Sequence, residues 1–173
     1  MAKTDHVAAA LVKWMDRAFN DEDKAPAGGL SGGCQLRPGM GLPALDAFDD
    51  CVLAWVMAGQ RGKTEAFPAM ADYTQCNGRP VWEFSVGIAR CSTALGEGGF
   101  LPDIPTMEGE YAVQEDDKDR LESATCRAVA ELKNDNRLLN VALGPVEVYG
   151  PAGATVAVFR TIIVEPTKGR TTP

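Results

Sequence analysis

Five cysteines and a single histidine are the residues of this chain best suited to nucleophilic or metal chemistry. A cysteine nucleophile needs a base, but His6 falls in the first turn of a predicted helix, and no thiol-enzyme signature surrounds any cysteine. Zinc binding would require distant thiolates to converge, because the chain contains no CxxC pair. We therefore expect no catalytic, cofactor or metal site, and reduced thiols at Cys34, Cys51, Cys76, Cys91 and Cys126.

Acidic residues form the other concentrated set of polar groups, at Glu115, Asp116, Asp117 and Asp119. Their oxygens suit Ca²⁺ or Mg²⁺, yet the run lacks the alternating spacing and central glycine of an EF-hand loop. Glu115, Asp116 and Asp117 instead indicate the start of a helix, where negative charge complements the helix dipole. Helix capping and solvation of an exposed face therefore explain this cluster without a metal.

The overall charge limits the classes of partner. The chain has 173 residues, a formal net charge of −7 and a pI near 4.7, so it should not attract nucleic-acid phosphates or anionic lipid. No apolar run approaches the roughly 18 to 20 residues of a membrane span. We expect a single domain over residues 1–165, a flexible tail at 166–173, and no membrane contact.

Apolar residues recur at helical spacing from Val7 to Phe19, which predicts a helix over about residues 5–20. Nine glycines and prolines follow between residues 24 and 46. This density of backbone breakers predicts a long arm. An arm of this length is unusual in a compact domain unless it is functional or becomes ordered against a partner.

Two apolar runs predict strands. Residues 51–58 alternate large and small apolar side chains, which is typical of a strand, although a buried helix also fits. Residues 82–88 alternate more clearly. Their core face would carry Trp82, Phe84, Val86 and Ile88. A broad connection is predicted at 60–80 and a second Gly/Pro-rich arm at 96–113.

The remaining pattern predicts a helix and a hairpin. Two β-rich runs, 146–149 and 155–165, flank Gly150-Pro-Ala-Gly153 and indicate a closing hairpin. The helix beginning at the acidic run would bury the stripe Leu121, Ala124, Thr125, Ala128, Val129 and Leu132. Together these elements predict an α+β fold, with a mainly antiparallel sheet, two packed helices and long Gly/Pro-rich arms.

Short motifs are distributed along residues 45–165, namely Phe67-Pro68, Cys76-Asn-Gly-Arg79, Val86-Gly-Ile-Ala-Arg90-Cys91, Asp116-Asp117 and Gly144-Pro145. Together with the order of the predicted elements, they resemble a head-to-tail connector or tail-assembly family of actinobacterial phages. Within it the chain looks like the tail terminator proteins of long-tailed phages. These are small α+β subunits that form a ring, usually hexameric, on top of the tail tube and join it to the head. The resemblance does not cover the arm at 24–46.

The resemblance implies a structural virion protein and not an enzyme. It would form a homo-oligomeric ring in the neck of the virion, contact the tail tube protein and the head connector or stopper proteins, and assemble in the host bacterial cytoplasm. A head-completion or stopper protein is an alternative within the same connector. Outside this class, a dimeric small-molecule-binding regulatory module fits a sheet backed by two helices. A small hydrolase or transferase would need a convergent polar site, for which the sequence offers no candidate.

A ring of this kind leaves a channel through which DNA passes without specific binding. Lys or Arg in the channel would add salt-sensitive affinity for phosphates, whereas an acidic lining would repel them. An outer, solvated surface is the other explanation of the same acidic residues. The candidate channel lining is Glu108, Glu110, Glu115, Asp116, Asp117 and Asp119.

Overall fold

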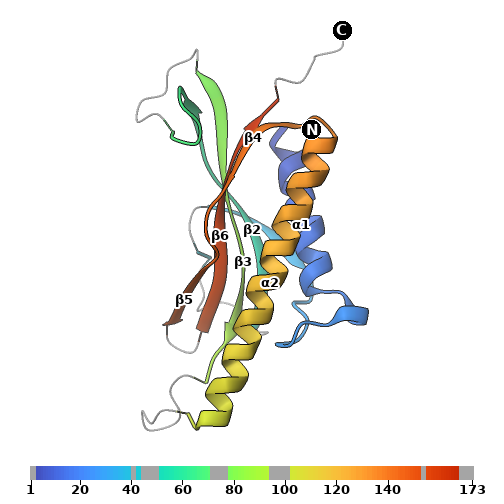
Figure 1. Cartoon of the computed structure of the whole chain (residues 1–173), viewed down its shortest axis with the longest axis vertical. Helices are drawn as coiled ribbons and strands as arrows, with labels where there is room; N and C mark the ends of the chain where they lie inside the picture. Colours follow the sequence, from blue (N-terminus) through green and yellow to red (C-terminus); the bar gives the residue numbers. More distant parts are fainter. Residues whose placement is uncertain are drawn as a thin grey trace.

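Two helices pack on one face of a twisted six-stranded sheet, which confirms the expected α+β fold (Figure 1). The computed structural model describes residues 3–39, 42–43, 51–70, 78–93, 102–152 and 155–167. The elements in chain order are α1 (Lys3–Phe19), the 3-10 helix η1 (Glu22–Lys24), β1 (Cys34–Pro38), β2 (Val52–Thr64), β3 (Arg79–Cys91), α2 (Ile104–Asn134), β4 (Leu138–Leu143), β5 (Glu147–Ala152) and β6 (Thr155–Pro166).

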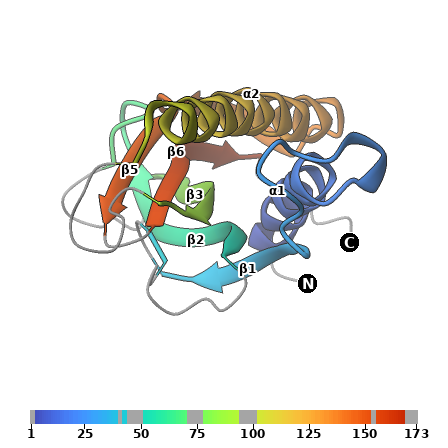
Figure 2. The same cartoon turned by 90° about the horizontal axis from the view of Figure 1, so that it is seen from below.

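The sheet has the strand order β1-β2-β3-β6-β4, and β5 also pairs with β6. All of these pairs are antiparallel except β1 with β2, which is parallel. Residues 51–58 therefore lie mostly in a strand, and the buried-helix alternative is wrong. Viewed from below, α2 crosses the sheet (Figure 2). In the same view α1 and β5 lie at opposite ends of the sheet.

The main core lies between the sheet and the two helices. The helical stripe of α1 is buried through Phe19, close to the predicted helix end, and the predicted stripe of α2 is buried at every position. On β3, Phe84, Val86 and Ile88 face these helices, as predicted. The opposite face of the sheet carries a second cluster made by Leu53, Trp55, Met57, Ala89 and Ala157. Both faces of the central strands are therefore buried.

The arm predicted at 24–46 is wrong as a continuous loop, because β1 lies within it. β1 is an edge strand, where prolines and glycines are tolerated because one side of the strand donates no ladder hydrogen bonds. Gly33 and Gly39 bracket it with φ angles of +120° and +130°, which L side chains rarely adopt. Residues 40–41 and 44–46 of the predicted arm lie outside the described residues.

The second helix begins eleven residues earlier than the acidic run suggested, so the arm predicted at 96–113 is wrong for 104–113. Asp103 caps α2 by accepting a hydrogen bond from the Thr106 backbone N–H (3.1 Å), and Pro105 follows in the first turn. The acidic run at 115–117 therefore lies inside the helix and does not interact with its dipole at the terminus. Residues 94–101 lie outside the described residues.

The C-terminal part contains one strand more than predicted. The closing hairpin is confirmed by the antiparallel pairing of β5 with β6. β4 was not predicted, and it pairs with the end of β6 that β5 leaves unpaired. The predicted connection at 60–80 is shorter, because β2 continues to Thr64 and β3 starts at Arg79. β6 extends to Pro166, which is the first residue of the tail predicted at 166–173. Residues 168–173 of that tail lie outside the described residues.

Candidate functional site

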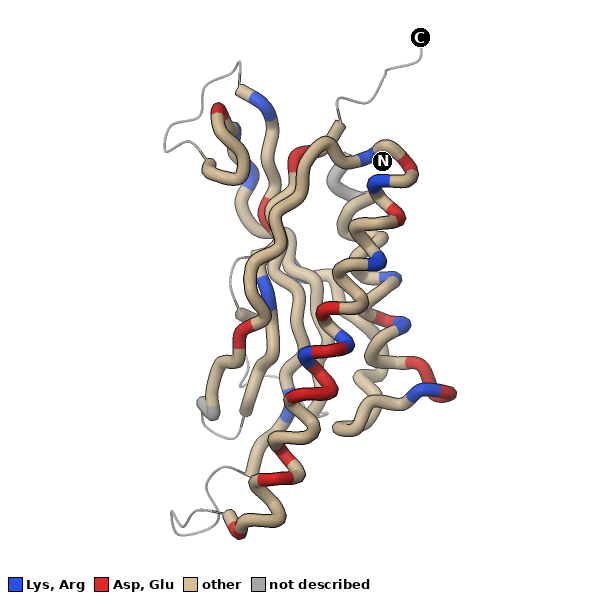
Figure 3. The backbone as a smooth tube through the Cα atoms, in the orientation of Figure 1, with Lys and Arg blue, Asp and Glu red and all other residues tan. Residues whose placement is uncertain are grey.

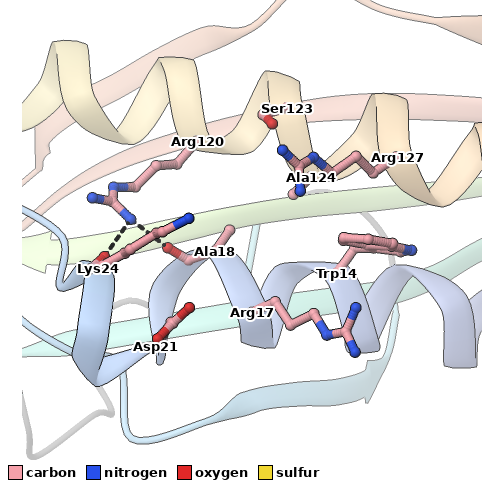
Figure 4. A pocket seen from close by; sticks show the side chains of 9 residues that line it. All are labelled: Trp14, Arg17, Ala18, Asp21, Lys24, Arg120, Ser123, Ala124 and Arg127. Atoms are coloured by element: carbon pink, nitrogen blue, oxygen red, sulfur yellow. Dashed lines mark hydrogen bonds between the residues drawn. The ribbon is translucent and has the colours of Figure 1, made fainter.

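An open groove between α1 and α2 holds a pocket of about 430 Å³ (Figure 4). We call it the cationic groove. Its charged lining consists of four cations and one carboxylate, Asp21, and comes from α1, η1 with its N-cap, and α2. The chain as a whole has seven more acidic than basic residues. Cations gathered in one place in such a chain indicate an anion-binding surface. The groove is lined by Trp14, Arg17, Ala18, Asp21, Lys24, Arg120, Ser123, Ala124 and Arg127.

Trp14 contacts two of the four cations of the groove. The guanidinium groups of Arg17 and Arg127 lie 5.0 Å and 5.5 Å from the centroid of its indole ring, within cation–π distance. The indole Nε1–H donates to Glu131 Oε2 at 2.7 Å, and Lys13 Nζ contacts the same oxygen at 2.8 Å. These hydrogen bonds lower the pKa of Glu131, so one end of the groove already holds a carboxylate in its ionised form.

Arg120 closes the other end of the groove and serves the fold. Its Nη1 donates to the backbone carbonyls of Ala18 (2.9 Å) and Lys24 (2.8 Å), and its Nε donates to Asp116 (2.8 Å). It therefore ties the segment after α1 to α2. Within the described part of the chain, the side chains of Arg17, Lys24 and Arg127 form no ion pair. These three cations are the ones left to receive an anion from outside.

A second pocket, of about 440 Å³, lies beside a buried ion pair between β3 and α2. Arg90 Nε and Nη2 donate to the two carboxylate oxygens of Asp117 at 2.6 Å and 2.8 Å. Arg90 Nη1 donates to the carbonyls of Gly28 (2.6 Å) and Gly29 (3.1 Å). A Cβ on Gly28 would lie 2.6 Å from the Arg90 guanidinium, so a glycine is needed here. Burial raises the pKa of Asp117, and the hydrogen bonds from Arg90 oppose that shift. The pair is a structural clamp on residues 28–29.

The acidic residues predicted to line a channel do not share one surface. Figure 3 shows them along the first half of α2, where acidic groups outnumber basic ones. Asp117 is 2% exposed and paired with Arg90, while Asp116 binds Arg120 and the backbone N–H of Ala27. Neither carboxylate faces solvent freely.

The other four acidic residues differ in their partners. Glu110 accepts hydrogen bonds from Ser92 and Thr93, and these lower its pKa against the opposing effect of burial. Glu115 pairs with Lys118 at 2.5 Å. Glu108 and Asp119 are exposed, and neither forms an ion pair with another described residue. These last two are the members of the set most available to a channel.

The expectation of reduced cysteines is wrong for Cys51 and Cys91, which form a disulfide. The antiparallel register places Val52 opposite Arg90, so Cys51 and Cys91 are the next facing pair, with Cα atoms 4.8 Å apart. Their separation of 40 residues leaves no local motif, which is why the sequence pattern missed them. Cys34 and Cys126 are free thiols, and Cys76 lies outside the described residues.

Alkylation should separate the cysteines into classes. With iodoacetamide at pH 8 and no reductant, we expect Cys126 to react readily because it is exposed. Cys34 should react slowly, because burial, reinforced by Asp16, raises the pKa of its thiol to about 12 and leaves little thiolate. Cys51 and Cys91 should react only after reduction. Peptide mass spectrometry checks this, and labelling of Cys51 in native protein that has been kept in air-saturated buffer would contradict the disulfide.

Exposed apolar side chains mark both edges of the sheet and the start of α2. Leu36 on β1 is 56% exposed, Leu139 on β4 is 55% exposed and Tyr149 on β5 is 47% exposed. At the start of α2, Ile104 and Tyr111 are each more than 60% exposed.

No family model matches the chain, and no curated protein matches its sequence significantly. These surfaces must therefore be interpreted from their own chemistry.

Within the described ranges, no three His, Cys, Asp or Glu side chains are placed to hold a metal ion. None of the helices described is long and apolar enough to cross a membrane. His6 lies on the exposed surface of α1.

The cationic groove was missed by sequence reasoning, although Lys13 and Arg17 are four residues apart in one helix and Arg120 and Arg127 are seven apart in the other. Each spacing places its two cations on one face of a helix, but it does not show that the two faces adjoin.

Proposed function

We propose that the chain is a structural subunit of a closed ring, the tail terminator in the neck of a long-tailed phage. The observation that carries the proposal concerns the two edges of the sheet. They are formed by different strands, and each exposes apolar side chains. Leu36 is exposed on the β1 edge, and Leu139 and Tyr149 are exposed on the β4 and β5 edge. A ring forms when two different, complementary surfaces of the same subunit meet head to tail and the rotation closes.

The ring would cap the tail tube, join it to the head connector and leave a channel for DNA. Glu108 and Asp119 are the exposed acidic side chains that could face this channel in a chain of net charge −7. Carboxylates repel phosphates, so DNA would pass without being retained. Because disulfides persist in oxidising surroundings, a subunit assembled in the host cytoplasm would form the bond between Cys51 and Cys91 after release of the virion.

Light scattering and negative-stain imaging test the ring. We expect a particle of six times the chain mass of 18.4 kDa, either for the protein alone or after mixing with purified tail tubes. Leu36→Glu should prevent ring formation without lowering the melting temperature, because this side chain is exposed in the single chain. Leu30→Glu, at an exposed position outside the strands, is the matched control and should assemble.

Three outcomes would contradict the proposal. A strictly monomeric chain in both free and tail-bound samples would exclude a ring. A stable dimer whose melting temperature rises with a metabolite would favour the small-molecule-binding regulatory module instead. A ring that binds the head connector but not the tail tube would identify the subunit as the stopper.

A further inference from the structure

At each end of the cationic groove, residues of the groove or next to it already bind a carboxylate of the same chain. At one end Lys13 and Trp14 hold Glu131, and at the other end Arg120 holds Asp116. Between them, Arg17 and Arg127 are held against the Trp14 ring at 5.0 Å and 5.5 Å. These contacts restrict the two exposed guanidinium groups before a ligand binds, which reduces the conformational freedom they lose on binding. The chemistry of the groove therefore suits a further carboxylate-bearing segment.

A segment with that chemistry lies on the far side of α2. Glu108, Glu115 and Glu122 are seven residues apart, so they share one stripe of the helix at intervals of about 10.5 Å. Tyr111 lies on the same stripe and is 63% exposed. We call these four residues the acidic stripe.

The two surfaces cannot meet within one chain. Glu115 and Glu122 precede Arg120 and Arg127 by five residues each, which places the stripe about 140° around α2 from the side that lines the groove. Arg120 and Arg127 are also seven residues apart, so α2 lines the groove with cations at the same interval as the carboxylates of the stripe. Of these two, Arg127 is the one available to a stripe carboxylate, because Arg120 is bound to Asp116.

We propose that the cationic groove of one subunit receives the acidic stripe of α2 from a second copy of this chain. The inference rests on the ring proposed above and specifies one of its contacts. Arg17, Lys24 and Arg127 of one copy would pair with Glu108, Glu115 and Glu122 of the next. Since the groove and the stripe are different surfaces on different sides of α2, the contact runs head to tail, as a ring requires.

Charge reversal on each surface tests the contact. The groove variant carries Arg17→Glu and Arg127→Glu, and the stripe variant carries Glu108→Lys and Glu122→Lys, which leaves the pair of Glu115 with Lys118 intact. Like charges then face each other in each pure variant, and we expect the subunit concentration needed for half-assembly to rise at least about tenfold. Light scattering at about 0.15 M salt measures it, and unchanged melting temperatures confirm that the variants are folded.

An equimolar mixture of the two variants gives the decisive result. In the mixture, an acidic groove faces a basic stripe and a basic groove faces an acidic stripe, so alternating subunits should close an even-membered ring again. Glu65→Lys and Arg137→Glu are the controls, because both residues are exposed and outside the groove and stripe. Both controls should assemble like the parent.

The outcomes separate this contact from the ring itself. If the parent forms rings and both variants form them equally well, the contact is wrong and the ring stands. If the variants fail and their mixture does not recover, the groove receives some other partner and the contact is again wrong. If the parent forms no ring alone or on tail tubes, the ring and the contact fail together.

Discussion

Replacing Arg90 with methionine should lower the free energy of unfolding by about 3 to 5 kcal/mol, because it leaves the Asp117 carboxylate buried without its partner. Asp117 is 2% exposed, and both of its oxygens accept hydrogen bonds from Arg90. The carbonyls of Gly28 and Gly29 lose their donor in the same variant. Denaturant unfolding followed by circular dichroism gives the free energy.

The double variant Arg90→Met with Asp117→Leu should recover most of that loss, since no unpaired charge remains buried. Arg137→Met is the matched control, because Arg137 is exposed and its contact with Asp135 is 3.7 Å long, so a change within about 0.5 kcal/mol is expected. An Arg90→Met protein as stable as its parent would show that the ion pair is not formed.

The pH dependence of the Arg90→Met variant follows from the same carboxylate. Burial already raises the pKa of Asp117 in the parent, and loss of Arg90 removes the interactions that oppose the shift. A carboxyl whose pKa is higher in the folded chain favours folding below its unfolded pKa, and this stability is lost as the pH rises through the folded pKa. The variant should therefore be less destabilised, relative to the parent, near pH 4 than at pH 7.

Phe84→Ala should also cost about 3 to 5 kcal/mol of the free energy of unfolding, because it removes a large ring from the main core. Phe84 is 1% exposed and stands on β3 between Ala58 of β2 and Ile162 of β6. A loss of this size is a large part of the stability of an ordinary domain. Urea unfolding of the parent and the variant measures the difference.

Tyr111→Ala is the matched control for Phe84→Ala. It also removes an aromatic ring, but from a side chain that is 63% exposed in the single chain. At subunit concentrations below those needed for assembly, the expected change is therefore within about 0.5 kcal/mol. Equal stability of the Phe84→Ala variant and its parent would mean that β3 presents its other face to the helices. Equal losses in both variants would mean that Tyr111 is buried in an assembly under the conditions used.

The regular apolar patterns were enough to predict the core. Helical spacing from Val7 to Phe19 and alternation from Trp82 to Ile88 identified the buried faces, because a helix and a strand repeat with different periods. β4 escaped prediction because its run of six residues is short, and three of its side chains, Val141, Ala142 and Leu143, are only half-buried. The start of α2 escaped because Gly98, Gly99, Pro102 and Pro105 suggested a loop, although a proline is tolerated in the first turn of a helix.

The acidic cluster shows the limit of local reasoning most clearly. Residue types and spacing determined that carboxylates gather on one segment, but they could not show that Asp117 pairs with Arg90 across 27 positions. The same limit applies to Cys51 and Cys91, which only the register of β2 with β3 brings together.

By itself, the sequence determined the α+β class, the buried faces of the two helices and β3, and the acidic excess. Each of these depends on periods or composition within one segment. Only the tertiary structure decided the disulfide, the clamp made by Arg90 and the cationic groove around Trp14. Each of these joins side chains from separate elements, and their meeting depends on strand register and helix packing, which local periodicity does not encode.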